Sequence, residues 1–363
     1  MSKTLRAIGL MSGTSLDGID VALLETDGQE VVQRGPSATY PYEEGMQALL
    51  RRALFDAAQV SHRDDRLGSM TECEAKITRF HVEAVQSFFS QHELNDSNID
   101  VVGFHGQTVV HKPELRLTIQ LGDGQALAKA IGVPVVYDMR AADVAAGGQG
   151  APLVPAYHRA LAKTKPAVFV NIGGVANVTF IGSDGTLLAF DTGPGNALLD
   201  DWMIKHHGAT YDAGGATALS GTVSSSHMRM AQAHPYFRQA PPKSLDRNSF
   251  SNLDLGGLSL ADGAATLAAL TAATIARSAD WFPEVPRQWV ICGGGRHNAA
   301  IMQHLQHSLT NVVPAEALGL NGDSMEAEAW AYLAVRSFHG LALTYPGTTG
   351  APHALTGGKL AKP

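Results

Sequence analysis

The chain has 363 residues, of which 45% are hydrophobic and 17% charged, so it can bury a large core and is expected to form two domains rather than one. Its formal net charge of −7 argues against a nucleic-acid or membrane-surface binder, because such proteins present a basic face. The N-terminus MSKTLRAIGL has no signal-peptide core, and no apolar run approaches the roughly 18 residues of a membrane span. Two cysteines are too few for a disulfide framework or a thiolate zinc site, so we expect a reducing cytoplasm.

The first predicted element is a β-hairpin with a turn rich in glycine and hydroxyl groups. Two short β-like runs, 5–10 and 19–24, flank the turn of GLMSGTSLDGID, residues 9–20. Gly13 and Gly18 permit positive φ, which lets successive backbone N–H groups point into one concavity. Phosphate is the ligand that such a turn is expected to hold.

Two other interpretations of this turn must be weighed. The glycine spacing is that of a Walker A loop, but such a loop needs Lys where this chain continues with Ile19 and Asp20, so that interpretation fails. An ordinary hairpin with Asp17 and Gly18 at its bend remains open, because Asp-Gly is the commonest short-hairpin signal. The turn alone does not decide between the hairpin and phosphate binding.

The chain then alternates between helical and strand-like patterns, which is typical of an α/β protein. Glycines and prolines break this pattern at 147–155, where we expect the chain to pass between two lobes. The predicted lobes are 1–145, with the first phosphate turn and part of a sugar site, and 146–363. The last helix of the second lobe is expected to be able to pack back on the first lobe. The predicted helices are 43–59 and 68–92, and the predicted strands are 100–104 and 133–137.

Polar residues follow two of these strands, where open α/β sheets bind ligands. His105, Gln107 and Thr108 suit sugar hydroxyls, although the first two could equally satisfy local backbone groups. Arg140 could form a bidentate pair with a carboxylate or phosphate, or it could pair with Asp138 or Asp143 as a structural contact.

The second half of the chain opens like the first, with a hairpin at a glycine turn. Two such turns on two lobes could grip a polyphosphate from opposite sides of a shared cleft. A third glycine turn, Gly293 to Gly295, follows a buried-strand pattern, and glycines there let a ring or sugar approach the backbone. Together the turns indicate a nucleotide, although α/β proteins also carry glycine turns for topological reasons. The predicted strands are 167–171, 175–181, 187–191 and 288–292, with turns at 172–174 and 183–185.

The segment LAFDTGPGNALLDDW contains the most informative acidic residue, Asp191. A carboxylate at a strand end beside a nucleotide is placed to take a proton from an attacking hydroxyl or water, as phosphoryl transfer requires. The alternative makes Asp191 a turn or N-cap residue before the following helix.

Histidines and helices in the last third add little chemistry. His304 and His307 lie at i, i+3 without a third ligand, so no zinc site is expected. The alanine-rich stretch 260–277 predicts a helix in the lobe core. Glu326 and Glu328 begin a further helix, and we expect one to face the cleft and the other to face solvent.

Eight phrases along nearly the whole chain resemble the anhydro-N-acetylmuramic acid kinase family. They are GLMSGTSLDGID, FHGQTVVHKP, GGQGAPLVP, NIGGVANVT, FDTGPGN, PPKS, CGGGRHN and DSMEAEAWAYLAVR. The resemblance implies an α/β, two-lobed, actin-like ATPase fold, a duplicated ribonuclease H-like arrangement with a central cleft that closes over ATP and Mg²⁺. It also implies a cell-wall recycling reaction in which ATP and water convert 1,6-anhydro-N-acetylmuramic acid into N-acetylmuramic acid 6-phosphate and ADP.

The resemblance also implies roles for individual residues. Asp191 would deprotonate the attacking water, Arg140 would bind the lactyl carboxylate of the substrate, and Thr108 and Glu326 would contact the sugar. A homodimer is implied as well. The residues implied to bind ATP are Gly13, Thr14, Ser15, Leu16, Asp17, Gly18, Ile19, Asp20, Asn171, Gly173, Gly174, Gly293, Gly294 and Gly295.

The resemblance leaves the metal site and two alternative functions open. The magnesium ligand is not singled out among Asp17, Asp20, Asp191 and other acidic residues, and the place where the wider superfamily carries an early Asp is apolar here, near Met11. A non-catalytic ATP and sugar sensor of the same fold is one alternative to the kinase. An ordinary sugar kinase is the other.

Overall fold

The computed structural model describes residues 3–13, 15–250 and 252–363, and its contacts divide the chain into two compact units. The first unit contains Met1–Leu161 and Ser324–Pro363, and the second contains Ala162–Asp323. This division falls 16 residues later than the predicted boundary after residue 145, and it returns the C-terminal segment to the first unit. The reason is packing: α5 (Pro155–Leu161) contacts α11 (Met325–Phe338), and the hydroxyl of Tyr157 donates to the Glu328 carboxylate over 2.7 Å.

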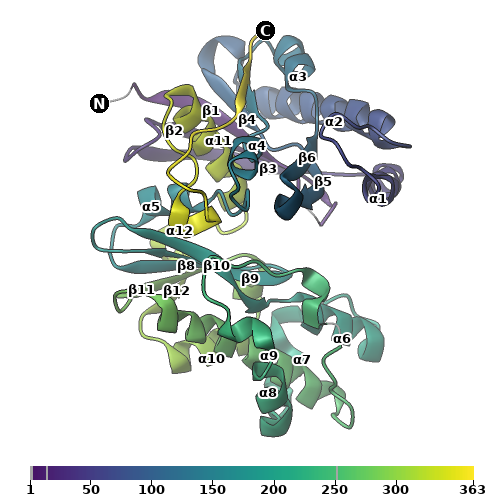
Figure 1. The fold of residues 1–363 in the computed structure, drawn as a ribbon, viewed down its shortest axis with the longest axis vertical. Helices are drawn as coiled ribbons and strands as arrows, with labels where there is room; N and C mark the ends of the chain where they lie inside the picture. The colour runs from purple at the N-terminus through teal and green to yellow at the C-terminus, as the bar shows by residue number, and fades with distance from the viewer. Residues whose placement is uncertain (1–2, 14, 251) are drawn as a thin grey trace. The chain divides into compact units, whose positions relative to one another are not determined.

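The first unit is built on a six-stranded sheet in the order β13-β7-β4-β1-β2-β3 (Figure 1). Strands β1, β2 and β3 are antiparallel neighbours, β4 and β7 continue the sheet in parallel to β1, and β13 closes its edge antiparallel to β7. The strands are β1 Leu5–Met11, β2 Gly18–Thr26, β3 Val32–Pro41, β4 Val101–Phe104, β7 Val135–Tyr137 and β13 Lys359–Ala361, with a separate pair, β5 Gln107–Lys112 and β6 Leu117–Leu121.

Helices of the first unit come from both ends of the chain. In Figure 1 the yellow-green helix α11 lies against the purple strands β1 and β2, and it also contacts β4. The α-helices are α1 Glu44–Ala57, α2 Met70–Gln91, α3 Gly124–Ile131, α4 Ala141–Ala145, α5, α11 and α12 Pro346–Thr349, with 3₁₀ turns at Asp96–Asn98 and Pro113–Leu115.

Two glycines allow α11 to approach the sheet closely. A Cβ atom on Gly9 would lie 1.8 Å from the Ala327 carbonyl oxygen, and one on Gly103 would lie 2.1 Å from that of Trp330. Neighbouring positions of the strands and helix are fully buried, so the close approach builds the core. It also fixes the start of α11, which carries Glu326, beside strands β1 and β4.

The second unit has a five-stranded sheet in the order β10-β9-β8-β11-β12. The strands are β8 Ala167–Ile172, β9 Val175–Ile181, β10 Leu187–Pro194, β11 Gln288–Cys292 and β12 Val312–Pro314. The α-helices are α6 Ala197–His207, α7 Ala216–Ser220, α8 Ser225–Gln232, α9 Leu260–Arg277 and α10 Ala299–Ser308. Short 3₁₀ turns lie at Ala213–Gly215, Pro235–Arg238, Arg247–Phe250, Ser278–Trp281, Gly294–His297 and Ala315–Leu318.

The two sheets share one topology. In each, three antiparallel strands come first in the chain, and two further strands then join in parallel beside the first of them. Thus β3-β2-β1-β4-β7 corresponds to β10-β9-β8-β11-β12, which is the strand order of a ribonuclease H-like unit present twice. The predicted duplicated α/β fold is confirmed.

Element predictions are accurate where periodicity is strong and wrong where a strand bends. Helix α9 has the predicted bounds, because its alanine-rich sequence is buried along most of its length. Strand β10 does not end at Asp191 as predicted but continues to Pro194, with an irregularity in its pairing between Asp191 and Gly193. Thr192, Gly193 and Pro194, which follow the predicted strand end, therefore extend the strand.

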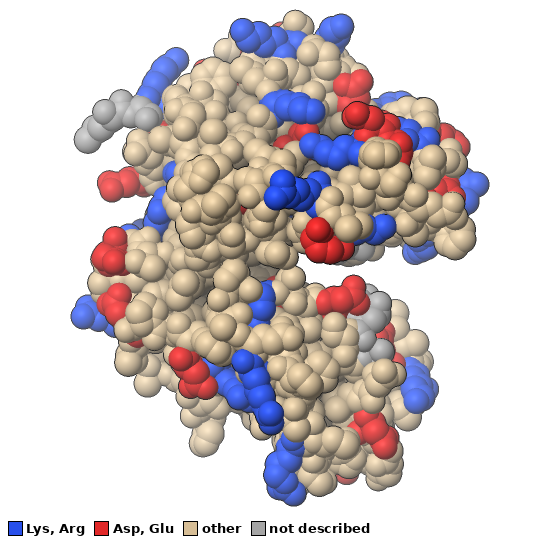
Figure 2. Space-filling model, in the orientation of Figure 1, with Lys and Arg blue, Asp and Glu red and all other residues tan. Residues whose placement is uncertain are grey.

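Charge and hydropathy of the folded chain agree with its composition. On the face drawn in Figure 2, blue Lys and Arg residues and red Asp and Glu residues are interspersed rather than gathered by sign. Among the described helices, none combines the length and apolar character that crossing a membrane requires.

Candidate active site

A six-residue connection, 12–17, joins β1 to β2. The two strands pair antiparallel up to the Met11–Asp20 pair, so the predicted hairpin is confirmed. The alternative two-residue turn at Asp17 and Gly18 is wrong, because Gly18 already belongs to β2. Thr14, one of the residues predicted to bind ATP, lies outside the described residues.

Glycine acts in this loop differently from the prediction. Neither Gly13 nor Gly18 has a positive φ, and Leu16 takes the left-handed conformation instead, with a φ of 61°. Gly18 is needed for space, since a Cβ atom there would lie 2.6 Å from the Tyr40 carbonyl oxygen on β3. The predicted reason for the two glycines is therefore wrong, although the loop is present.

The remaining predicted ATP residues of this loop offer different groups. Ser15 donates to the exposed Asp17 carboxylate over 2.6 Å, and Asp20 accepts from the Thr39 hydroxyl over 2.6 Å. Ile19 is fully buried in the core, so it can offer only its backbone to a ligand.

Residues 105–107, which follow β4, form hydrogen bonds with the loop. The buried Gln107 side chain donates to the Gly13 carbonyl over 3.0 Å and accepts from the Ser12 hydroxyl over 3.0 Å. The Nδ1 atom of His105 lies 3.0 Å from the Ser12 carbonyl oxygen. His105 and Gln107 thus satisfy backbone groups, as one alternative held, and the backbone that they satisfy is that of the predicted phosphate loop.

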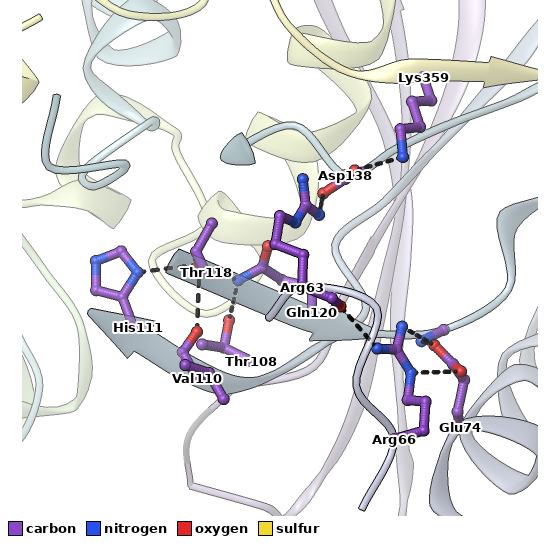
Figure 3. A network of polar contacts seen from close by, with 11 residues as sticks. Arg63, Arg66, Glu74, Thr108, Val110, His111, Thr118, Gln120, Asp138 and Lys359 are labelled. Carbon is purple, nitrogen blue, oxygen red and sulfur yellow. Dashed lines mark hydrogen bonds and ion pairs between the residues drawn. The ribbon is translucent and has the colours of Figure 1, made fainter. Parts of the chain in front are cut away.

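Arg140 does not make the structural ion pairs considered from the sequence. Asp138 instead pairs with Arg63 and, over 3.1 Å, with Lys359 (Figure 3). Asp143 accepts from the Gly150 backbone N–H over 2.6 Å. Within the part of the chain that the structure describes, neither carboxylate forms an ion pair with Arg140, so those alternatives are wrong.

The Arg140 guanidinium is held by neutral groups. It donates to the Gly150 carbonyl over 2.9 Å and to Nε2 of His105 over 3.1 Å, and its central carbon lies 5.2 Å from the centre of a Trp330 ring. Burial lowers the pKa of Arg140 to about 10, opposed by the nearby Glu326 carboxylate. The group therefore remains cationic at neutral pH.

Glu326 lies in the first turn of α11, where the charges of Arg140 and Asp20 act on its carboxylate. Burial raises its pKa, the Arg140 charge opposes this rise and the Asp20 charge adds to it. Glu328 is only 3% exposed and accepts from Tyr157 and Ser324, so the expectation that one of the pair faces solvent is wrong.

Thr108 lies on β5, where the Gln120 side chain of β6 fixes its hydrogen bonding (Figure 3). The Gln120 amide donates to the hydroxyl oxygen of Thr108 over 3.2 Å and to that of Thr118 over 2.9 Å. The Thr108 oxygen is thus an acceptor within the protein, and its hydrogen has no partner among the described residues. That hydrogen can be donated to a ligand.

Two glycine turns come together in the second unit. Asn171 of β8 pairs with Cys292 of the parallel strand β11, so the turns that follow these strands are neighbours. Gly293 has a φ of 72°, and a Cβ atom there would lie 2.3 Å from Oδ1 of Asn171. The predicted ATP residues of this unit, Asn171, Gly173, Gly174, Gly293, Gly294 and Gly295, therefore form one cluster.

The start of α6 closes this cluster. The Asn196 backbone N–H donates to the Gly173 carbonyl over 2.7 Å, and the Gly195 backbone N–H donates to the Gly174 carbonyl over 3.0 Å. A Cβ atom on Gly295 would lie 2.2 Å from the Ile172 side chain, so only glycine fits there. Gly293 and Gly295 are thus needed for packing within the protein. A Cβ atom on Gly173, Gly174 or Gly294 would meet its nearest atom only at 3.6–3.7 Å, so these three leave room for a ligand beside the main chain.

Asp191 is half-buried on β10, not a turn or N-cap residue, so that alternative is wrong. Its Oδ2 atom accepts from the Leu245 backbone N–H over 2.7 Å, and its carbonyl accepts from the Tyr236 hydroxyl over 2.6 Å. Among the described residues no donor reaches Oδ1. Burial raises the pKa of Asp191 to about 6, against the lowering effect of the Leu245 hydrogen bond. The carboxylate is held firmly, with one oxygen available as a base.

Metal ligands are sparse in both units. In 3–13, 15–250 and 252–363, no group of three or more His, Cys, Asp or Glu side chains could hold a metal ion. Mg²⁺ usually takes only one or two carboxylates and completes its shell with phosphate oxygens and water, so such a group is not a requirement for binding it. Met11, where the superfamily carries an Asp, accepts from the Trp330 indole N–H instead.

Two residues that contact Arg140 were not assigned to the site from the sequence. His105 was noted but not assigned, because the alternatives for a single histidine were equal. Trp330 was not noted at all. Its position four residues after Glu326 places both on one face of α11, and this spacing was the signal that could have revealed it.

Comparisons with known proteins identify the family. The model of the family described as anhydro-N-acetylmuramic acid kinase matches residues 5–362. The anhydro-N-acetylmuramic acid kinase of Rhodopseudomonas palustris (strain BisB18) is 52% identical over 365 residues, 99% of this chain and 100% of that protein. The protein of the same description from Agrobacterium fabrum is 50% identical over 372 residues, 100% of both chains. The chain belongs to the anhydro-N-acetylmuramic acid kinase family.

Proposed function

We propose that the protein uses ATP and water to convert 1,6-anhydro-N-acetylmuramic acid into N-acetylmuramic acid 6-phosphate and ADP. Family membership supports the substrate class, and one observation carries the mechanism. That observation is Asp191, a carboxylate with a pKa of about 6, one oxygen fixed by Leu245 and the other without a donor among the described residues. A general base works best with a pKa near the working pH.

The proposed reaction couples two bond changes. Asp191 accepts a proton from water through Oδ1 as the water oxygen bonds to C1 of the sugar. The C1–O6 bond breaks, and its electron pair stays on O6. O6 then bonds to the γ-phosphorus of ATP, and the bond to the β,γ-bridging oxygen breaks to release ADP. The ether oxygen has no proton to lose, so the reaction needs a base for the water only.

Other residues bind and orient in this proposal. The loop 12–17 with Asp20, and the clustered turns of the second unit, hold the nucleotide. Arg140 binds the lactyl carboxylate, Thr108 donates a hydrogen bond to a sugar oxygen, and Glu326 accepts from a sugar hydroxyl. A cationic Arg140 and a donating Thr108 suit a substrate rich in oxygen acceptors.

Mg²⁺ supplies charge neutralisation for the phosphates in this proposal. Asp20 fits as its protein ligand, because it lies on a strand beside the loop and the requirement is only one or two carboxylates. A reaction that consumes ATP also favours a cytoplasmic location. The homodimer implied by the family resemblance stays a prediction.

The experiment runs the reaction in ¹⁸O-labelled water and locates the label by mass spectrometry. We expect the ¹⁸O label on C1 of the product. Samples are taken before the anomeric oxygen exchanges with water, and the rate of that exchange is measured separately on the product alone. Asp191→Asn should bind both substrates yet turn over about 10²-fold or more slowly. Asp184→Asn, in the exposed turn before β10, is the matched control and should keep full activity.

Each alternative predicts another result. Label in inorganic phosphate would mean simple ATP hydrolysis and would overturn the proposal. ATP and sugar binding without ADP release would support the sensor. Faster phosphorylation of the already open sugar than of the anhydro-sugar, with no label at C1, would support an ordinary sugar kinase.

A further inference from the structure

His105 connects the predicted phosphate loop to Arg140. Its side chain is 5% exposed and lies against the Trp330 ring, with ring centres 4.6 Å apart. Nδ1 lies 3.0 Å from the Ser12 carbonyl oxygen, while Nε2 lies 3.3 Å from Nε and 3.1 Å from Nη2 of Arg140. One imidazole therefore contacts both parts of the first unit's site.

These contacts allow only one form of the ring. The Ser12 carbonyl can only accept, so Nδ1 of His105 must carry a proton. The Arg140 nitrogens can only donate, so Nε2 must present its lone pair. Burial and then the Arg140 charge hold the pKa of His105 well below its ordinary value, which agrees with a neutral ring. The hydrogen bonds thus select the Nδ1–H tautomer.

The same contacts select which edge of Arg140 remains available. A guanidinium has five N–H donors in a fixed plane. His105 takes the edge formed by Nε and Nη2, and the Gly150 carbonyl takes one donor of Nη1 over 2.9 Å. One donor remains on Nη1 and one on Nη2, the two nitrogens at the end of the side chain. This pair matches the two oxygens of one carboxylate.

We propose that His105 is a positioning residue that presents the end-on edge of Arg140 to the substrate carboxylate and ties this edge to the phosphate loop at Ser12. The inference rests on the proposed function, because it assigns Arg140 to the lactyl carboxylate. It predicts that the carboxylate and the nucleotide bind cooperatively, since each orders one side of the same imidazole.

Two substitutions separate the two sides of the ring. His105→Asn places an amide near the Nδ1 position and keeps a donor for Ser12, but it leaves Arg140 without its acceptor. His105→Gln extends an amide oxygen toward the Nε2 position and keeps the Arg140 contact, but it loses the bond to Ser12. His158→Gln is the matched control, because His158 is equally buried, at 4% exposure, and lies on α5 rather than in the segment after β4.

The experiment measures binding by calorimetry on the full chain. The probes are the anhydro-sugar acid and its carboxamide analogue, each with and without ADP and Mg²⁺. For the parent and for His158→Gln we expect about 10-fold or greater preference for the acid and about 5-fold or greater tightening by ADP. His105→Asn should lose the acid preference to within about 3-fold. His105→Gln should keep that preference but lose the tightening by ADP.

The outcomes distinguish failure of the inference from failure of the proposed function. If the parent binds neither sugar or does not prefer the acid, the assignment of Arg140 in the proposed function fails. If the parent prefers the acid and both His105 variants behave like the parent, the inference is overturned. If both variants lose both effects while His158→Gln does not, thermal unfolding decides: an unchanged Tm supports positioning of Arg140, and a Tm lowered by more than about 10 °C rejects it in favour of a structural role.

Discussion

At the scale of single residues, chemistry here depends on surroundings more than on residue type. Asp184 lies in the turn before β10 and Asp191 lies on that strand, yet burial raises the pKa of Asp191 to about 6, while hydrogen bonds from Thr186 lower the pKa of exposed Asp184. The sequence predicted Asp191 as a base from its place after a strand. It could not predict the hydrogen bond from Leu245, 54 residues away, because that contact depends on the folded segment after α8.

The pKa of Asp191 predicts the acid limb of the pH profile. Above about pH 6 the carboxylate is ionised and can accept a proton, and below it the base is lost. We expect kcat/KM for the anhydro-sugar to fall about tenfold per pH unit below pH 6. Steady-state rates from pH 4.5 to 8 check this, with circular dichroism to verify that the chain stays folded. A flat profile down to pH 5 would contradict the assignment.

The same pKa predicts that the base costs stability. Folding raises the pKa of Asp191 from 3.8 to about 6, so its ionised form disfavours the folded state above pH 6. Asp191→Asn keeps an acceptor for Leu245 and should raise the free energy of unfolding at pH 7.5 by at most about 3 kcal/mol. The gain should shrink as the pH falls from 6 to 4, because the parent carboxylate becomes neutral. Urea unfolding of the parent and the variant at pH 7.5 and at pH 4 tests the direction of this stability difference. An Asp191→Asn variant that is less stable than the parent at pH 7.5 would refute the prediction.

At the scale of elements, close approach explains what periodicity could not. The long helices and most strands of the two sheets were predictable from hydrophobic patterns, as the matching bounds of α9 illustrate. The strands β3, β5, β6, β12 and β13 were not predicted. The contact between α11 and the sheet was not, because Gly9 and Gly103 read as weak positions in strands rather than as sites of close contact. The burial of the Glu328 carboxylate was also not predicted, because its hydrogen-bond partner Tyr157 lies 171 residues away in the sequence.

This contact gives a prediction for Gly9. Gly9→Ala would place a methyl group 1.8 Å from the Ala327 carbonyl oxygen, so α11 must shift and the core with it. We expect a loss of about 2 kcal/mol or more in the free energy of unfolding. Gly45→Ala is the control, because nothing lies within 4 Å of a Cβ atom there and the residue is in the first turn of α1. It should stabilise the protein by up to about 1 kcal/mol.

The prediction is checked by denaturant unfolding of both variants under the same conditions. If Gly9→Ala and the parent have the same free energy of unfolding, β1 and α11 can move apart without a loss of stability, and the prediction is wrong. A shift of Glu326 with α11 should also raise the KM for the sugar, and this effect should be absent from Gly45→Ala.

At the scale of the whole molecule, the two units differ in how the chain makes them. The second unit is one continuous stretch, Ala162–Asp323, whereas the first needs both ends of the chain. The duplicated topology was implied by the family resemblance, and the similar hairpin patterns predicted only that the two halves open alike. The return of residues 324–363 to the first unit was only an option in the sequence, since nothing local distinguishes a helix that packs on one lobe from a helix that packs on the other.

Continuity predicts different behaviour for fragments. Residues 162–323 expressed alone should fold cooperatively, because their sheet and core cluster are complete within the stretch. Residues 1–161 alone should not, because β1, β2 and β4 lose α11. Circular dichroism and thermal melts check both fragments. Adding a peptide of residues 324–363 to 1–161 should restore a melting transition, and a well-folded 1–161 without that peptide would contradict the prediction.

The first unit is completed only when the C-terminal segment has been synthesised. Synthesis finishes the second unit while the strands that carry the loop 12–17 still lack the helix that covers them. A nascent or prematurely terminated product therefore carries a nearly complete set of site residues on an unfinished scaffold. Such products should lack a folded first unit, because the helix that contacts β1, β2 and β4 comes from residues 324–363.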